Sequence, residues 1–287
     1  MRILIVGSDT SLGEALHGFL LAQGRHAIEV LERGDCRWKS ERQAKKALRR
    51  ANCDLVVDIR IAVAVDSGKI IRDLDIDRTY WLAKASHRNG VGYLYLSSSR
   101  VFSGTIERLY SEDDYPDNEE TVGELLLRGE SVVRDSCERH LILRLGPVFS
   151  HLNSNAMTHL LGQLKQGGSV LLDSNLRGSP VVAEDAARVV SALVDQLSTQ
   201  ADVWGIYHYC SSEVTNCYEF AESVLASASQ FSEFSAAAVQ LVKHSEPSAQ
   251  LNRALDCTKI GRTFAIKQVP WRGFIADSVK KYFLANQ

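Results

Sequence analysis

Side chains that could bind or polarise a substrate follow one apolar segment of the chain. The segment spans residues 93–96, and Ser97, Ser98, Ser99 and Arg100 come directly after it. Hydroxyl groups at the end of a strand can hydrogen-bond a substrate, and an arginine can bind an anionic ligand. Serines also satisfy backbone groups at strand ends, and a surface arginine is common there. Taken alone, these residues leave both interpretations open.

Further motifs follow the serine run, and their order favours a substrate site there. An acidic loop at residues 110–114 precedes a segment that contains Gly123, Gly129 and Glu130. This order resembles the dTDP-4-dehydrorhamnose reductases, which are extended short-chain dehydrogenases/reductases that read S-T-D-Y-V-F-x-G, then P-Y-x-E-x-D, then V-Y-G-x-x-K-x-x-G-E. The resemblance places Ser98 at the family's catalytic Ser/Thr position and implies a Rossmann fold.

Two positions depart from the family's catalytic pattern. Anchored on Gly123, Gly129 and Glu130, the family's tyrosine falls on Val122 and its lysine on Leu126. In the family, the tyrosine protonates the substrate carbonyl while hydride arrives from the nicotinamide, and the lysine lowers the tyrosine's pKa. Valine and leucine can do neither, and general acid catalysis is typically worth about 10²–10⁴-fold. We therefore expect no catalytic residue among Ser98, Val122 and Leu126.

A glycine turn predicts a phosphate site. Residues 7–13 lie between a strand and a helix, where backbone N–H groups and the helix dipole can bind pyrophosphate. The family reads G-x-x-G-x-x-G, and Thr10 stands at its middle glycine; the Cβ crowds the phosphates, although the hydroxyl could donate to one. We expect the site to use Gly7, Thr10, Ser11, Leu12 and Gly13. A tight turn that binds nothing is the alternative.

Two further positions bear on the cofactor. Glu32 stands where an acidic residue binds the adenosine ribose of NAD, while Arg33 beside it suits the 2′-phosphate of NADP. The family's N-A-A-A turn here reads Asp58-Ile59-Arg60-Ile61, so bulky residues should fill part of the nicotinamide path. Asp58 should repel a phosphate that Arg60 attracts. We expect weak or absent binding of NADP or NAD, with the nicotinamide half contributing least.

Apolar and amphipathic segments alternate along the first half of the chain. This pattern predicts an α/β fold, a Rossmann-type doubly wound parallel sheet, in residues 1–150. Residues 151–287 should form a smaller α/β substrate-binding lobe. The resemblance to extended short-chain dehydrogenases/reductases allows a strand and a helix of this lobe to cross back to the first domain. The expected strands are residues 2–6, 27–31, 55–59, 92–96 and 141–145, and the expected helices after the first are residues 37–50, 78–88 and 119–137.

The second half carries weaker family signals. Gly178-Ser179-Pro180 matches G-S-P-T, and residues 205–208 match G-x-Y-H. The R-P-x-x-S-x-L-D motif shrinks to a segment around Arg253, which puts the sugar-nucleotide contacts in doubt. The resemblance implies a substrate-lobe site formed by Ser98, Arg100, Gly178, Ser179 and Arg253.

Bulk properties exclude several classes of protein. A net charge of −2 over 287 residues gives no electrostatic case for nucleic acid or a membrane surface. The six cysteines and eight histidines show no metal-ligand spacing, so we expect no metal site. No apolar run approaches the ~18–20 residues of a membrane-spanning helix. A strand begins at residue 2, so we expect no signal peptide and a cytoplasmic location.

Three functions follow from these features. The first is a catalytically inactive relative of the reductases that binds a nucleotide or nucleotide-sugar weakly and acts as a regulatory or partner subunit. The regulatory beta subunit of methionine adenosyltransferase, a relative of this family, shows that the fold can serve such a role. The second is an active NAD(P)H-dependent nucleotide-sugar reductase or epimerase with a rebuilt site. The third is a structural interaction module, with a protein partner or a second copy, that binds no nucleotide. We favour the first.

Overall fold

A six-stranded parallel sheet, together with the helices on its two faces, forms one part of the molecule, which we call the first layer. The computed structural model describes residues 1–231, 239–244 and 251–286. The strand order is β10-β5-β4-β3-β1-β2, and every neighbouring pair is parallel. This confirms the Rossmann-like α/β fold class. The strands are β1 Arg2–Val6, β2 Ala27–Leu31, β3 Leu55–Asp58, β4 Gly92–Ser98, β5 His140–Leu145 and β10 Gly205–Tyr209.

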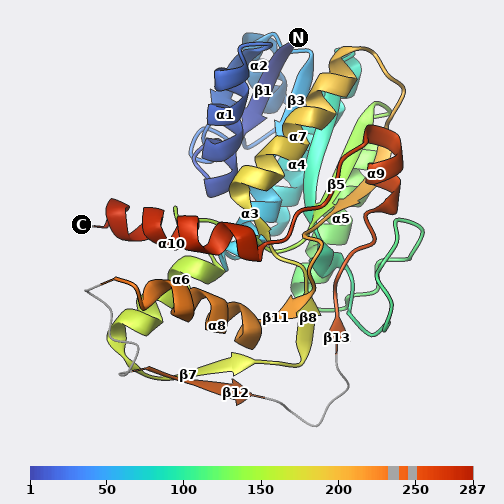
Figure 1. Cartoon of the computed structure of the whole chain (residues 1–287). Helices are drawn as coiled ribbons and strands as arrows, with labels where there is room; N and C mark the ends of the chain where they lie inside the picture. Colours follow the sequence, from blue (N-terminus) through green and yellow to red (C-terminus); the bar gives the residue numbers. More distant parts are fainter. Residues whose placement is uncertain (232–238, 245–250, 287) are drawn as a thin grey trace.

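Helices cover both faces of this sheet (Figure 1). Helices α1 and α7 pack together on one face, and α2, α4 and α5 pack side by side on the other. Strands β3 and β4 are buried along their whole length because both faces are covered, which explains their nearly continuous apolar sequences. The helices are α1 Ser11–Gln23, α2 Glu41–Ala51, α4 Asp73–Arg88, α5 Thr121–Ser136 and α7 Ala183–Ser198.

Helix α1 has the ends and the buried face that its sequence predicts. Thr10 caps its first turn by accepting a hydrogen bond from the N–H of Gly13. Gly24 ends it in the left-handed conformation, with φ of +63°. Leu12, Leu16 and Leu20 recur on one face and are all fully buried.

Three helices depart most from what we expected. Helix α3, Arg60–Asp66, begins where we expected only a turn. Helix α4 begins five residues earlier than predicted, because the side chain of Asp75 accepts the N–H of Arg72 and closes its first turn. Helix α2 begins at Glu41 rather than at residue 37. The preceding segment is drawn inward by Trp38, which is only 5% exposed.

The described residues of the remaining part of the molecule, the second layer, form short strands and the helices α6, α8 and α10. Strand β8 pairs with β11 and β13, β7 pairs with β12, and β6 pairs with β9. Phe220 of α8, Phe283 of α10 and Trp271, which directly precedes α10, join α6 in a separate apolar core. The elements are β6 Val148–Phe149, α6 Ala156–Gln166, β7 Gly168–Asp173, β8 Leu176–Gly178, β9 Val181–Val182, β11 Thr215–Asn216, α8 Cys217–Ala228, β12 Val239–His244, β13 Leu251–Asn252 and α10 Arg272–Ala285.

The chain passes between the two layers more than once. After β9 it returns to the first layer as α7 and β10, and then re-enters the second layer at β11 (Figure 1). Two further short elements lie in the described part of the chain, the 3-10 turn η1 Ser99–Val101 and helix α9 Thr258–Phe264. Among the described residues, no helix combines the length and apolarity needed to cross a bilayer.

Candidate functional site

The glycine turn after β1 packs tightly against α1. Gly7 has a φ of +97°, a conformation that favours glycine. A Cβ on Gly13 would clash with the carbonyl oxygen of Gly7 and with the backbone of Ser8, so the helix can approach the turn only because Gly13 has no side chain. The N–H groups of Ser11 and Leu12 have no acceptor among the described residues, as is usual in a first helical turn. These two groups could bind an anion.

Thr10 does not present its hydroxyl proton to a ligand. Its Oγ1 donates to the carbonyl oxygen of Gly7 at 2.8 Å and accepts from the N–H of Gly13 at 3.0 Å. The expectation that this hydroxyl could donate to a phosphate is therefore corrected, because the turn itself uses the proton.

Arg33 is held by a residue of the glycine turn. Its backbone N–H and its Nε donate to the carboxylate of Asp9 at 2.8 and 3.0 Å. Burial opposes the charge on Asp9, but these hydrogen bonds outweigh it and lower the pKa of Asp9. A 2′-phosphate would have to compete with Asp9 for Arg33. Glu32 is exposed at the end of β2.

A buried ion pair lies beneath the same turn. The guanidinium of Arg60 donates to both carboxylate oxygens of Asp58, at 2.9 and 2.6 Å, and the hydroxyl of Tyr93 donates to Asp58 at 2.7 Å. Trp38 lies against the guanidinium, with 5.4 Å from Cζ to the ring centroid. A Cβ on Gly7 would lie 3.2 Å from Cγ of Arg60. Arg60 therefore occupies the space directly under the glycine turn.

This arrangement corrects two expectations about residues 58–61. Asp58 and Arg60 neutralise each other instead of acting separately on a phosphate. Ile59 and Ile61 are buried in the core, so the bulk near the turn comes from Arg60. A cavity of about 160 Å³ remains beside the pair, lined in part by Arg33 and Arg78. Ligand pockets are typically about 300–1,000 Å³, so this space does not fit a dinucleotide.

The helix that should carry an acid and a lysine packs against the core. Leu126 on α5 is 0% exposed, and Val122, Leu125 and Val132 are partly buried against the same core. Neither Val122 nor Leu126 lines the pocket of about 410 Å³ that lies at the carboxyl end of β4.

Side chains from β4, α5, β5 and β10 form a buried polar network. Arg144 donates to both oxygens of Glu130, at 2.9 and 2.7 Å, and Ser97 donates to Glu130 at 2.6 Å. Burial, with the charge of Arg144, lowers the pKa of His208 to about 3. The neutral His208 can therefore accept from Arg144 at Nε2 and donate from Nδ1 to the carbonyl oxygen of Tyr110. Motif order pointed to Ser97, Glu130 and the segment that contains His208 as separate positions, but not to Arg144 or to the contacts among them.

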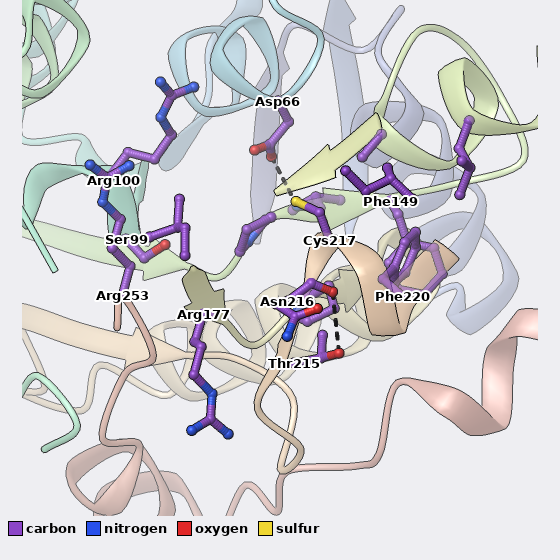
Figure 2. Close-up of a pocket in the computed structure, with 18 of the residues that line it drawn as sticks. Asp66, Ser99, Arg100, Phe149, Arg177, Thr215, Asn216, Cys217, Phe220 and Arg253 are labelled. Atoms are coloured by element: carbon purple, nitrogen blue, oxygen red, sulfur yellow. Dashed lines mark hydrogen bonds between the residues drawn. The ribbon is translucent and has the colours of Figure 1, made fainter. Parts of the chain in front are cut away.

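A well-formed pocket lies where the carboxyl end of β4 meets the second layer. Its volume is about 410 Å³, within the range of small-molecule sites. Arg100, Arg253 and Ser99 lie at one side of it, and Phe149 and Phe220 at the other (Figure 2). The remaining lining comes mostly from α6, β8 and β11, and includes Asp66, Pro147, Val148, His159, Leu160, Leu172, Arg177, Gly178, Asn216 and Cys217.

The cationic side of the pocket is only partly neutralised. Arg253 donates to Glu120 at 3.0 Å and to the backbone of Ser103 at 3.2 Å, which fixes it in place. Arg100 lies 3.8 Å from the same carboxylate of Glu120. One carboxylate thus faces two guanidinium groups, and the excess positive charge favours an anionic ligand.

The predicted substrate-lobe residues separate into two groups. Arg100, Gly178 and Arg253 line the pocket. Ser98 and Ser179 are buried and do not, and the Oγ of Ser98 accepts the backbone N–H of Arg100 at 3.3 Å. The sequence analysis missed Asp66 and Arg177, because neither belongs to a recognisable motif. Asp66 reaches the pocket because it is the last residue of helix α3, which was not predicted.

Asp66 is the titratable group of the pocket with the most perturbed acidity. Burial raises its pKa to about 7, although its carboxylate accepts the N–H of Val148 at 3.1 Å. An unfolded aspartate has a pKa near 3.8. The folded protein therefore binds this proton more tightly than the unfolded chain, and stability falls as the pH rises from about 4 to about 7.

Asp66→Asn should remove this pH dependence. The amide oxygen can still accept the N–H of Val148, but no charge is buried above neutral pH. We expect the variant to melt several degrees above the unsubstituted protein at pH 8, and the difference to shrink towards zero at pH 4. Parallel thermal denaturation at the two pH values measures this, with Asp113→Asn, at an exposed position, as the matched control. An equal difference at both pH values would contradict the prediction.

Comparison with known proteins relates the whole chain to one family. A family model described as the RmlD substrate binding domain matches residues 1–284. A dTDP-4-dehydrorhamnose reductase from Sinorhizobium fredii is 25% identical over 284 residues, covering 94% of each protein. The Pongo abelii protein named methionine adenosyltransferase 2 subunit beta is 23% identical over 305 residues, covering 99% of this chain and 88% of that protein.

Solved structures show the same fold at low sequence identity. A dTDP-4-dehydrorhamnose reductase from Clostridium acetobutylicum superimposes with a TM-score of 0.83 at 18% identity, over 100% of both chains. The Bacillus anthracis enzyme of the same name, in complex with NADP, gives 0.78 at 18% identity, over 99% of this chain and 98% of that one.

Proposed function

The chain belongs to the RmlD substrate binding domain family, and from that premise we propose that it is a catalytically inactive member. It binds a nucleotide or nucleotide-sugar weakly in the pocket between the layers and acts as a regulatory or partner subunit. In this proposal residues 1–150 keep the dinucleotide-binding framework, residues 151–287 supply the substrate lobe, and the protein works in the cytoplasm.

The replacement of the proton donor carries this proposal. The family's tyrosine and lysine positions fall on Val122 and Leu126, and Leu126 exposes no surface to a ligand. Ser98, at the family's Ser/Thr position, is also buried outside the pocket. A family-type hydride transfer would leave the substrate oxygen without its usual acid.

The cofactor half of the site supports weak or absent binding of NADP or NAD. The N–H groups of Ser11 and Leu12 could still hold a pyrophosphate, and Glu32 could hold a ribose. Arg60 fills the space under the turn, and Asp9 holds Arg33. Binding should therefore come from the adenosine and phosphate groups, and the nicotinamide should add little.

The pocket supports an anionic ligand with an apolar part. Arg100 and Arg253 suit phosphates or a carboxylate, while Phe149 and Phe220 offer aromatic surface to a base or a sugar face. Nucleotide-sugars combine these features. The relative named as a subunit of methionine adenosyltransferase 2 supports a partner role for such a protein.

One observation favours the alternative of an active reductase with a rebuilt site. Asp66, with a pKa of about 7, lies in the pocket and could give a proton to a bound carbonyl. Its carboxylate is engaged with the N–H of Val148, so it would have to donate from its other oxygen.

Titration calorimetry with NADH, NADPH, ADP-ribose and dTDP tests the proposal. We expect NAD(P)H to bind no more tightly than ADP-ribose, with Kd in the high micromolar range or weaker. The loss of two or three hydrogen bonds to the dinucleotide is enough to weaken binding this far. Each bond is worth about 1 kcal/mol, and about 1.4 kcal/mol changes Kd tenfold. dTDP should bind through the pocket.

The variant Arg100→Gln should weaken dTDP binding several-fold. Arg128→Gln is the matched control, because Arg128 is exposed on α5 and pairs with Asp73 outside the pocket. Low-micromolar binding of NADPH would favour the active enzyme instead. Absence of binding by all four nucleotides would favour the structural module that binds no nucleotide.

A further inference from the structure

A groove of about 550 Å³ lies between α2 and β2, away from the ligand pocket. Figure 1 shows α2 at the opposite end of the molecule from β7 and β12. Three consecutive residues of β2, Glu29, Val30 and Leu31, line the groove together with Leu4 of β1. Leu4 is in register with Glu29, so both face α2. The groove therefore runs between α2 and the edge strand β2.

The wall formed by α2 is cationic. Lys46 and Arg50 line the groove from one face of the helix, and Arg37 extends this wall before the helix begins. All three are exposed, and none has an ion-pair partner in the part of the chain that the structure describes. Glu29 and Asp35 lie on the strand side of the groove. Ala47 and Ala51 leave small apolar surface between the charges.

The strand beside this wall has an open edge. β2 ends the sheet order and pairs only with β1 among the described strands. Such an edge presents backbone N–H and C=O groups that another extended chain can pair with. Native sheets commonly cover or block an edge of this kind, whereas here a groove runs beside it.

We propose that this groove binds an extended acidic peptide segment of a partner protein. The segment pairs with the edge of β2 and directs its acidic side chains towards Arg37, Lys46 and Arg50. Because side chains alternate along a strand, acidic residues at every second position face α2 together. The intervening residues point to the other face of the sheet.

The strand edge distinguishes a peptide from other anionic partners. Nucleic acid or an anionic lipid surface would also be attracted to three cations, but neither has a backbone that can pair with β2. The net charge of −2 gives the whole molecule no general attraction to either. The cations therefore act as a local determinant beside a peptide-binding edge.

Fluorescence anisotropy with a labelled eight-residue peptide, in which glutamate alternates with valine or threonine, tests this on the full chain. We expect saturable binding that weakens at least tenfold in the variant Lys46→Glu/Arg50→Glu. The control Arg42→Glu/Arg49→Glu makes the same charge change on exposed positions of the same helix that do not line the groove. It should change the affinity less than threefold.

A second peptide separates strand pairing from charge attraction. N-methylation of alternate residues keeps the glutamates but removes backbone donors, and should abolish binding. Equal binding of the methylated peptide, or equal losses in the two double variants, would overturn the proposal. Tighter binding of a single-stranded 12-mer DNA or of phosphatidylserine vesicles than of the peptide would also overturn it.

This surface deepens the proposed partner role, on which it rests, but uses none of the ligand-pocket residues. Nucleotide binding by the Lys46→Glu/Arg50→Glu variant should be unchanged. Failure of the peptide titration with intact dTDP binding would reject the groove alone, whereas failure of dTDP binding would reject the ligand proposal alone.

Discussion

Arg144→Met should lower the free energy of unfolding by about 3–5 kcal/mol, the range for breaking a buried ion pair from one side. Glu130 is 0% exposed and Arg144 is 1% exposed, so the substitution leaves the Glu130 carboxylate buried without its cation. The substitution also removes the donor to His208. Urea unfolding at pH 7, followed by circular dichroism, measures the change.

Two control variants show whether charge or shape is responsible. Arg144→Met/Glu130→Leu removes both charges and should recover much of the loss, because an apolar pair can replace a buried ion pair. Arg128→Met breaks the exposed pair with Asp73 and should change stability by less than about 1 kcal/mol. A double variant as unstable as Arg144→Met would show that shape dominates.

The purified protein should reduce dTDP-4-dehydrorhamnose at least about 10²–10⁴-fold more slowly than a reductase assayed in parallel. Val122 and Leu126 have no proton to give, and Arg60 occupies the space below the phosphate turn. Oxidation of NADH and NADPH at high protein concentration measures the rate. A rate less than about 50-fold below that of the reductase would reject the proposal of inactivity.

Asp66→Asn identifies the source of any turnover that is found. If Asp66 supplies the proton, the variant should lose the activity. The rate of the unsubstituted protein should then fall as the pH rises through about 7, because Asp66 loses its proton. If turnover persists unchanged in Asp66→Asn, another group is the acid. Asp113→Asn is again the matched control at an exposed position.

Local patterns in the sequence determined the framework of the fold. The expected first and second strands coincide with β1 and β2, because short apolar runs bounded by glycine turns and helices have few alternative conformations. Gly24 ends α1 for an equally local reason, since the left-handed conformation there suits glycine. The order of motifs led to the family that the comparison then showed.

Only the tertiary structure decided which polar and charged groups meet. Asp9 and Arg33 are 24 residues apart, and Arg144 and His208 are 64 apart. Their pairing depends on how strands and helices pack, which no local pattern records. Arg60 looked like a cation available to a phosphate, yet it is neutralised by Asp58 two residues earlier and covered by Trp38.

The pocket and the groove were decided in the same way. Asp66, Arg100 and Arg253 come from three distant segments, and their proximity follows from the chain's repeated passage between the two layers. The acidity of Asp66 follows from burial at that junction, because removing a carboxylate from water favours its protonated form. A sequence specifies residue types and local backbone preference, whereas burial and charge pairing arise only when distant segments pack together.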